Sequence, residues 1–139
     1  MVVLDTDHLS ELDRGSLAGA RLQERLLAQR EEPAATIISA EEQFRGWLAQ
    51  IHQEADPHRQ IASYARLQRR IAFYAAWTVL PWDAAADIFT RLRAQGLRVG
   101  TMDLKIGSIA LAHGCLVLTG NRQDFQRIPD LRVEDWLRE

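Results

Sequence analysis

The sequence contains one cysteine, Cys115, and one lysine, Lys105, among its 139 residues. A single cysteine excludes an internal disulfide and is typical of a cytoplasmic protein. Because the neighbours of Cys115 in CLVLT (115–119) are apolar, we interpret it as a small buried strand residue. The cysteine and the four histidines show no spacing suited to a structural zinc site.

Long apolar runs are also missing. No run approaches the roughly 18 residues that a membrane-spanning helix needs. The opening MVVLDTD turns acidic within five residues, which does not fit a signal peptide. With 47% apolar and 26% charged residues, the composition is that of an ordinary globular domain. We therefore expect a single cytoplasmic domain spanning residues 1–139, without a membrane segment.

The charges are distributed unevenly although the net charge is only −2. Residues 57–123 hold nine basic and three acidic residues, a local charge of +6, and the remainder holds eight basic and sixteen acidic residues, or −8. Sixteen of the seventeen basic residues are arginines. Arginine favours bidentate phosphate contacts, but a coding bias toward arginine explains the same count.

Short apolar runs alternate with helical patterns, and we find no repeat or linker. We predict strands at residues 2–5, 34–39, 78–82, 115–120 and 131–136, the last at a sheet edge. We predict helices at residues 7–13, 16–30, 40–54, 83–96 and 101–114, and one more that begins within 56–60 with Pro57 in its first turn. Thr101 is the expected N-cap of its helix, and Gly96 the expected C-cap of the one before. This alternation predicts a mostly parallel central sheet with helices on both faces.

Acidic and amide side chains occur where these strands end. Asp5 ends the first predicted strand, Glu41 and Glu42 follow the second, and Asn121 and Asp124 follow the 115–120 strand. Asp103 lies in the first turn of the helix before that strand. Because ligands of such sheets bind beyond the carboxyl ends of the strands, we expect these side chains to lie along one edge. Oxygen ligands without matching bases are what Mg²⁺ or Mn²⁺ requires.

Each acid also has a purely structural interpretation. Asp5 can cap the following helix, and Glu41, Glu42 and Asp103 can stabilise helix N-termini through the macrodipole. Asp124 can be an ordinary loop acid. A shared edge for all of them favours a common site over separate coincidences.

Three motifs resemble the PIN-domain nucleases, in particular the VapC toxins of bacterial toxin–antitoxin modules. They are LDTDHLSEL (4–12), TIISAEEQFRGW (36–47) and MDLKIGSIALAHGCLVLTGNRQDFQRIPDLRVEDW (102–136). The resemblance implies a three-layer α/β/α PIN-like domain acting as a metal-dependent endoribonuclease, with tRNA or ribosomal RNA as substrate and Mg²⁺ (or Mn²⁺) as cofactor. It also implies a cognate VapB-like antitoxin and a homodimer.

Carried over by position, the resemblance assigns catalysis and metal binding to Asp5, Glu42, Asp103 and Asp124. Asn121 and Thr119 are expected to hydrogen-bond the substrate phosphate. Two choices stay open from the residues alone. Gly46 favours Glu42, four residues earlier, whereas helical phase favours Glu41, and either Asn121 or Asp124 completes the site.

A basic segment without acids, HRQIASYARLQRRIAFYAAW (58–77), is a candidate track for the RNA backbone. Its arginines Arg66, Arg69 and Arg70 fall largely opposite a stripe that includes Ile61, Tyr64 and Ile71. A solvated helix face explains the same pattern, and antitoxin contacts are a further use for it.

Two other functions compete with the nuclease. The first is a haloacid-dehalogenase-like phosphohydrolase, since Asp5-x-Asp7 follows a strand, but its required lysine should follow Thr119 and Lys105 precedes it. The second is a PIN-like module that has lost catalysis and binds RNA or a protein. Because all the core acids are present, we favour the nuclease.

Overall fold

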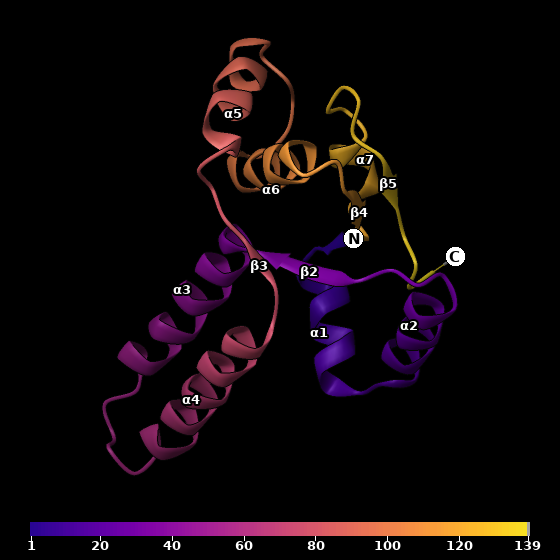
Figure 1. Cartoon of the computed structure of the whole chain (residues 1–139). Coiled ribbons are helices and arrows are strands. Elements are labelled where there is room, and N and C mark those ends of the chain that lie inside the picture. The colour runs from indigo at the N-terminus through magenta and orange to yellow at the C-terminus, as the bar shows by residue number, and fades with distance from the viewer. Residues whose placement is uncertain (139) are drawn as a thin grey trace.

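The computed structural model describes residues 1–138, so position 139 of the predicted domain lies outside the described residues. Figure 1 shows the chain. Within that range the strands are β1 (Val2–Leu4), β2 (Pro33–Thr36), β3 (Val79–Leu80), β4 (Leu116–Leu118) and β5 (Val133–Glu134). The helices are α1 (Thr6–Arg14), α2 (Leu17–Ala28), α3 (Ile37–Gln53), α4 (Gln60–Ala76), α5 (Ala85–Ala94), α6 (Thr101–Ala112) and α7 (Arg122–Phe125).

The strands form one sheet in the order β3-β2-β1-β4-β5, and every neighbouring pair is parallel. The apolar strand β1 lies at its centre, where Val3 pairs with Ala34 on one side and Val117 on the other. The predicted strand near the end of the chain is confirmed as the edge strand β5. All five strands therefore point their carboxyl ends toward the same edge.

Alternate residues of the central strands face opposite layers of helices. Val3 and Val117 belong to a core shared with α5, α6 and α7, whereas Val2, Leu4 and Leu118 belong to a second core shared with α1 and α2. Figure 1 shows these two groups of helices on either side of the strands. The predicted three-layer α/β/α architecture is confirmed.

The turn between α1 and α2 follows the expected chemistry. Gly15 has a left-handed backbone (φ 63°) that ends α1, and the Ser16 side chain accepts a hydrogen bond from the Gly19 amide at 3.0 Å. Thr101, by contrast, is the first residue of α6 and not its N-cap, which is Gly100. Gly96 is likewise not the C-cap of α5, which is Gln95; it follows the cap directly with a left-handed backbone (φ 67°).

The second strand is shorter than predicted because α3 begins at Ile37. The Thr36 side chain accepts a hydrogen bond from the Ser39 amide at 3.1 Å, which caps the helix N-terminus. This local bond and the burial of Ile38 override the strand propensity of two consecutive isoleucines. Glu41 and Glu42 consequently lie in the second turn of α3 and not at its start.

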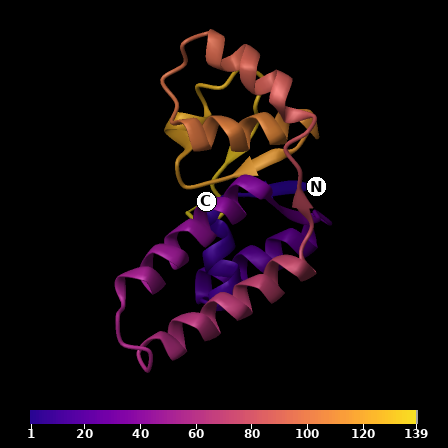
Figure 2. The same cartoon turned by 90° about the vertical axis from the view of Figure 1, so that its left-hand side faces the viewer.

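Helix α4 begins at Gln60, after a turn at residues 57–59 that contains Pro57. The Asp56 side chain accepts a hydrogen bond from the His58 amide at 3.0 Å, which stabilises this turn in place of a first helical turn. Helices α3 and α4 pack against each other and project beyond the sheet (Figures 1 and 2). None of the helices formed by residues 1–138 is long and apolar enough to cross a membrane.

Candidate functional site

Asp5 lies at the junction of β1 and α1 and makes two hydrogen bonds. Its Oδ1 accepts from the Thr6 amide at 2.8 Å, so the helix-capping interpretation is correct. Its Oδ2 accepts from the Thr119 hydroxyl, also at 2.8 Å, which joins the end of β1 to the end of β4. Asp5 and Thr119, which the sequence offered as separate site residues, are therefore brought together at the carboxyl edge of the sheet.

Asn121, which follows β4, joins Asp103 and Asp124 through its side chain. Its side-chain Nδ2 donates to Asp103 Oδ2 at 3.0 Å and to Asp124 Oδ2 at 3.1 Å. Its backbone amide donates to Thr119 Oγ1 at 3.0 Å, which links this group to Asp5. Asp103 stands in the first turn of α6, and Asp124 also contacts Arg127 at 3.2 Å. Asn121 and Asp124 thus form one hydrogen-bonded group with Asp103.

Glu42 and Glu41 lie in different surroundings. Glu41 is exposed and forms an ion pair with Arg45. Glu42 is half-buried, and its pKa is raised by burial and by the negative charges of Asp5 and Asp103. No acid lies in the first turn of α3, so the macrodipole interpretation of both glutamates is wrong. The charges of Asp5 and Asp103 thus act on Glu42, whereas Glu41 pairs with Arg45.

The pKa values of the grouped acids are raised by burial first and by neighbouring negative charges second. Burial and the charge of Asp7 raise the pKa of Asp5, although hydrogen bonds from Thr6 and Thr119 partly offset them. Burial and the charge of Asp5 likewise raise the pKa of Asp103. Like charges held together in a partly buried setting raise one another's pKa, and a bound cation removes that cost.

Asp7 has the opposite role, holding two turns together. Its Oδ2 accepts the Gly120 amide at 2.7 Å and its Oδ1 accepts the His8 amide at 2.8 Å. Burial alone would raise the pKa of Asp7, but these bonds and His8 outweigh burial and lower it. An acid with a lowered pKa and two occupied oxygens is a poor proton donor, which argues further against the phosphohydrolase alternative.

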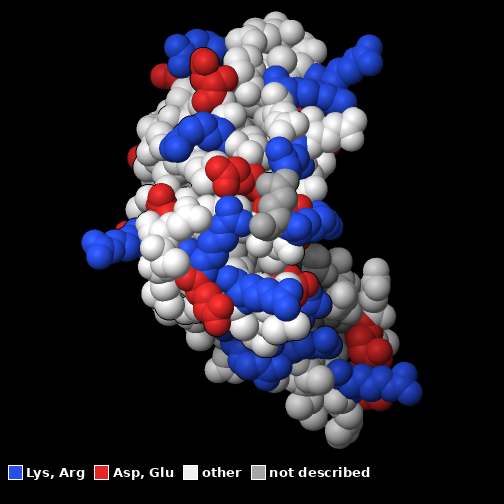
Figure 3. Space-filling model, turned by 90° about the vertical axis from the view of Figure 1, so that its right-hand side faces the viewer, with Lys and Arg blue, Asp and Glu red and all other residues white. Residues whose placement is uncertain are grey.

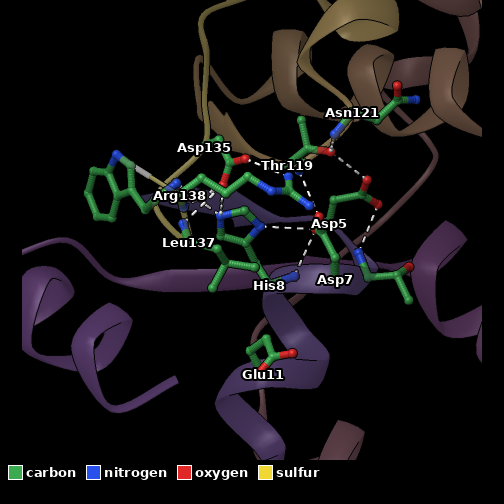
Figure 4. Close-up of polar contacts among 12 residues, drawn as sticks. Asp5, Asp7, His8, Glu11, Thr119, Asn121, Asp135, Leu137 and Arg138 are labelled. Carbon is green, nitrogen blue, oxygen red and sulfur yellow. Dashed lines mark hydrogen bonds and ion pairs between the residues drawn. The ribbon is translucent and has the colours of Figure 1, made fainter. Parts of the chain in front are cut away.

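His8 is fully buried and connects Asp7 to the segment 135–138. Its Nδ1 lies 3.0 Å from Asp7 Oδ1, and the Trp136 amide donates to its Nε2 at 3.1 Å. The two bonds define a tautomer protonated on Nδ1. Figure 4 shows this chain of contacts beside Asp5 and Thr119. The sequence placed His8 near the site, but it gave no signal for a partner 128 residues away.

The predicted RNA-backbone arginines do not share one surface. Arg66 and Arg69 are exposed on α4, whereas Arg70 forms an ion pair with Asp13 of α1 and lies over the Trp47 ring at 5.5 Å. Arg70 turns inward because α4 packs against α3 on this side, with Tyr74 of the same face buried. A backbone role stays a prediction for Arg66 and Arg69, and Arg70 is part of a groove wall.

Comparison with known proteins gives partial sequence matches. No protein-family model matches the chain. The tRNA(fMet)-specific endonuclease VapC of Salmonella typhimurium is 39% identical over 69 residues, which are 46% of this chain and 52% of that protein. The chain therefore spans about half the length of this curated relative in the match.

Solved structures match over nearly the whole chain. The DNA-bound VapBC structure from Salmonella typhimurium has a TM-score of 0.68 at 26% identity, covering 98% of this chain and 99% of that one. VapBC-5 of Mycobacterium tuberculosis, from the VapBC family of toxin–antitoxin systems, has a TM-score of 0.57 at 28% identity, covering 96% and 95%. The chain has the PIN-like fold of the VapC toxins. In this PIN-like domain the quoted motifs supply the ends of β1, β4 and the start of α6, where the acids meet.

Proposed function

We propose that this chain is a metal-dependent endoribonuclease and the toxin of a toxin–antitoxin module. The observation that supports this most directly is the grouping of Asp5, Glu42 and Asp103 at the carboxyl edge of the sheet: burial raises the pKa of all three, and the charge of Asp5 raises the pKa of Glu42 and Asp103 further. The similarity to a VapC endonuclease and to VapBC structures adds independent support. RNA phosphodiester bonds are the substrate, with tRNA or ribosomal RNA as the classes to test.

The donor set fits Mg²⁺ or Mn²⁺. Asp5, Glu42, Asp103 and Asp124 supply only carboxylate oxygens, the ligands these hard cations prefer. Within residues 1–138 no three His, Cys, Asp or Glu side chains are already gathered closely enough to hold an ion.

Each residue of the site has a proposed role. A bound divalent ion supplies positive charge that stabilises the phosphate and lowers the pKa of a water molecule. Glu42, whose pKa is raised, is suited to accept a proton from the attacking water. Thr119 orients Asp5, and Asn121 orients Asp103 and Asp124, through the bonds described above. Contact with the substrate phosphate is the further role proposed for Thr119 and Asn121.

Replacing Asp5 or Asp103 by asparagine tests the proposal. We expect RNA cleavage to fall at least about a hundredfold, because losing a ligand charge removes several kcal/mol of stabilisation while side-chain volume hardly changes. EDTA should stop cleavage, and Mg²⁺ or Mn²⁺ should restore it. Asp87→Asn is the matched control, since Asp87 is exposed on α5. Wild-type rates in both site variants would refute the assignment and favour the inactive-module alternative.

We further propose that a VapB-like antitoxin occupies a groove between α1, α3 and α4. The groove has a volume of about 220 Å³ and is lined by apolar Leu9, Trp47 and Phe73 together with the Asp13–Arg70 pair. Trp47 and Gln43 also line an adjoining hollow of about 390 Å³ that contains Glu42. A helix lying in the first groove could therefore extend to the acidic site and block it.

Co-expression tests the antitoxin proposal. Expression of the chain should arrest growth, and co-expression of the neighbouring gene should relieve the arrest. Trp47→Ala in the toxin should weaken that relief by removing an aromatic anchor, which commonly costs more than about 2 kcal/mol of binding energy. Relief that is unaffected by the substitution would place the antitoxin elsewhere.

A further inference from the structure

A groove beside α2 is lined by arginines and lies outside the acidic site. It has a volume of about 600 Å³, and its lining includes Arg21, Arg25 and Arg138 together with Leu17, Trp136 and Leu137. No acidic side chain is among the described residues that line it. Figure 3 shows basic side chains gathered over this side of the molecule. We call this feature the α2 groove.

Arg25 is held in a fixed orientation at the wall of the α2 groove. Its guanidinium lies over the Trp136 ring, 4.2 Å from the centroid. Glu134 accepts a hydrogen bond from Trp136 Nε1 at 2.6 Å and lies 3.7 Å from Arg25 Nη2. A guanidinium already fixed by stacking loses less side-chain entropy when it binds an anion.

Arg138 connects the α2 groove to the candidate active site. Its side chain is 70% exposed and its Nη1 donates to Asp135 Oδ2 at 2.8 Å. Arg138 Nη1 and Asp7 Oδ2 both lie against Gly120, since a Cβ built on that glycine would be 2.6 Å from the first and 2.4 Å from the second. Figure 4 shows the Arg138 side chain extending from the end of the chain toward Asp5 and Asp7. The groove therefore begins next to the turn that presents Thr119 and Asn121.

The third arginine is free to bind. Arg21 is exposed on α2, four residues before Arg25 and thus on the same helix face. It forms no ion pair with any residue in the range 1–138. Two oriented guanidiniums and one unpaired guanidinium along a path leading to the acids form a surface for a chain of negative charges.

We propose that the α2 groove binds the phosphate backbone of single-stranded RNA beside the cleavage site. The inference rests on the proposed nuclease function. RNA is favoured over an acidic peptide because the groove is continuous, through Arg138, with the site at which a phosphodiester would be cut. Backbone contacts position a nucleic acid without reading its sequence, so the groove contributes affinity and not target choice.

The test measures the affinity of the full chain for a fluorescent polyuridine oligonucleotide at several salt concentrations, in an Asp5→Asn background. Arg21→Ala/Arg138→Ala should lower the slope of log affinity against log salt by about 1.4, at about 0.7 per phosphate contact. The matched control is Arg91→Ala/Arg93→Ala, which removes the same charge from α5, on the opposite side of the sheet from α2 (Figure 1). Arg21→Lys/Arg138→Lys should keep the wild-type slope.

Each outcome bears on one proposal or on both. A reduced slope in the groove variant alone supports RNA binding in the α2 groove. Equal slopes in the groove and control variants overturn it, while cleavage by the wild-type chain leaves the nuclease proposal intact. Polyglutamate, an acidic peptide, is measured in the same way as the oligonucleotide. If Arg21→Ala/Arg138→Ala changes the affinity for neither probe, the groove binds neither and the inference is wrong. If it lowers the affinity for polyglutamate alone, the groove is a protein site and the inference is also wrong. If the wild-type chain neither binds nor cleaves RNA, both proposals fail.

Discussion

Two neighbouring aspartates differ in function because their surroundings differ. Burial, with the charge of Asp7 added to it, raises the pKa of Asp5, whereas His8 and the Gly120 amide lower the pKa of Asp7. The spacing Asp5-x-Asp7 therefore does not indicate a pair of equivalent ligands. Asp5 is suited to a cation, and Asp7 fixes the turns on either side of it.

The direction of each pKa shift determines how the contribution of that acid to folding stability changes with pH. A raised folded-state pKa, as at Asp5, Glu42 and Asp103, means that stability is present below the ordinary carboxyl pKa and is lost as pH rises through the raised value. For Asp7, with a lowered pKa, stability is present above the ordinary value and is lost as pH falls through the lowered one. At neutral pH the metal-free site is thus under electrostatic strain.

Asp103→Asn should relieve part of that strain. At neutral pH in EDTA we expect its melting temperature to exceed the wild-type value by roughly 1–4 °C, since the half-buried charge is largely screened by solvent. With Mn²⁺ at a hundred times its dissociation constant, the wild-type chain should gain about 2.7 kcal/mol, and the variant should gain little. Calorimetry with and without Mn²⁺ measures both effects. A variant that keeps the full Mn²⁺ shift would exclude Asp103 as a ligand.

At the level of elements, the sequence was most informative where local pattern and tertiary burial agree. The short apolar runs of β1 and β4 are buried on both faces, so their pattern predicted central parallel strands. The edge on which Asp5, Asp103 and Asn121 meet followed from that parallel order. The start of α3 could not be predicted in the same way, because the single bond between Thr36 and Ser39 outweighs the propensity of Ile37 and Ile38.

Contacts between distant segments left no trace in the sequence. The bond from Gly120 to Asp7 joins residues 113 apart, and the bond from Trp136 to His8 joins residues 128 apart. Neither follows from periodicity, because each depends on which loops the sheet order brings together. The basic middle of the chain similarly suggested one track for RNA, whereas packing of α4 on α3 separates Arg70 from Arg66 and Arg69.

At the level of the whole molecule, α4 has an exposed apolar stripe on the outer side of the projecting α3–α4 pair. Ile61, Tyr64 and Ile71 are 66%, 53% and 54% exposed, although they recur at helical spacing as core residues do. The inner side of α4 is occupied instead by Arg70 and Tyr74. Clustered apolar side chains on a projecting helix are typical of an interface.

We predict that this stripe forms the interface of a homodimer, with α4 of one copy packed against α4 of the other across a two-fold axis. Tyr64→Glu/Ile71→Glu should weaken dimerisation by roughly a hundredfold or more, because burying unpaired carboxylates costs about 3–5 kcal/mol. Sedimentation equilibrium over a range of concentrations measures the change. Leu27→Glu, at a residue of α2 that is 70% exposed, is the matched control and should dimerise like wild type. An equal loss in both variants, or a wild-type chain that stays monomeric throughout, would contradict this interface.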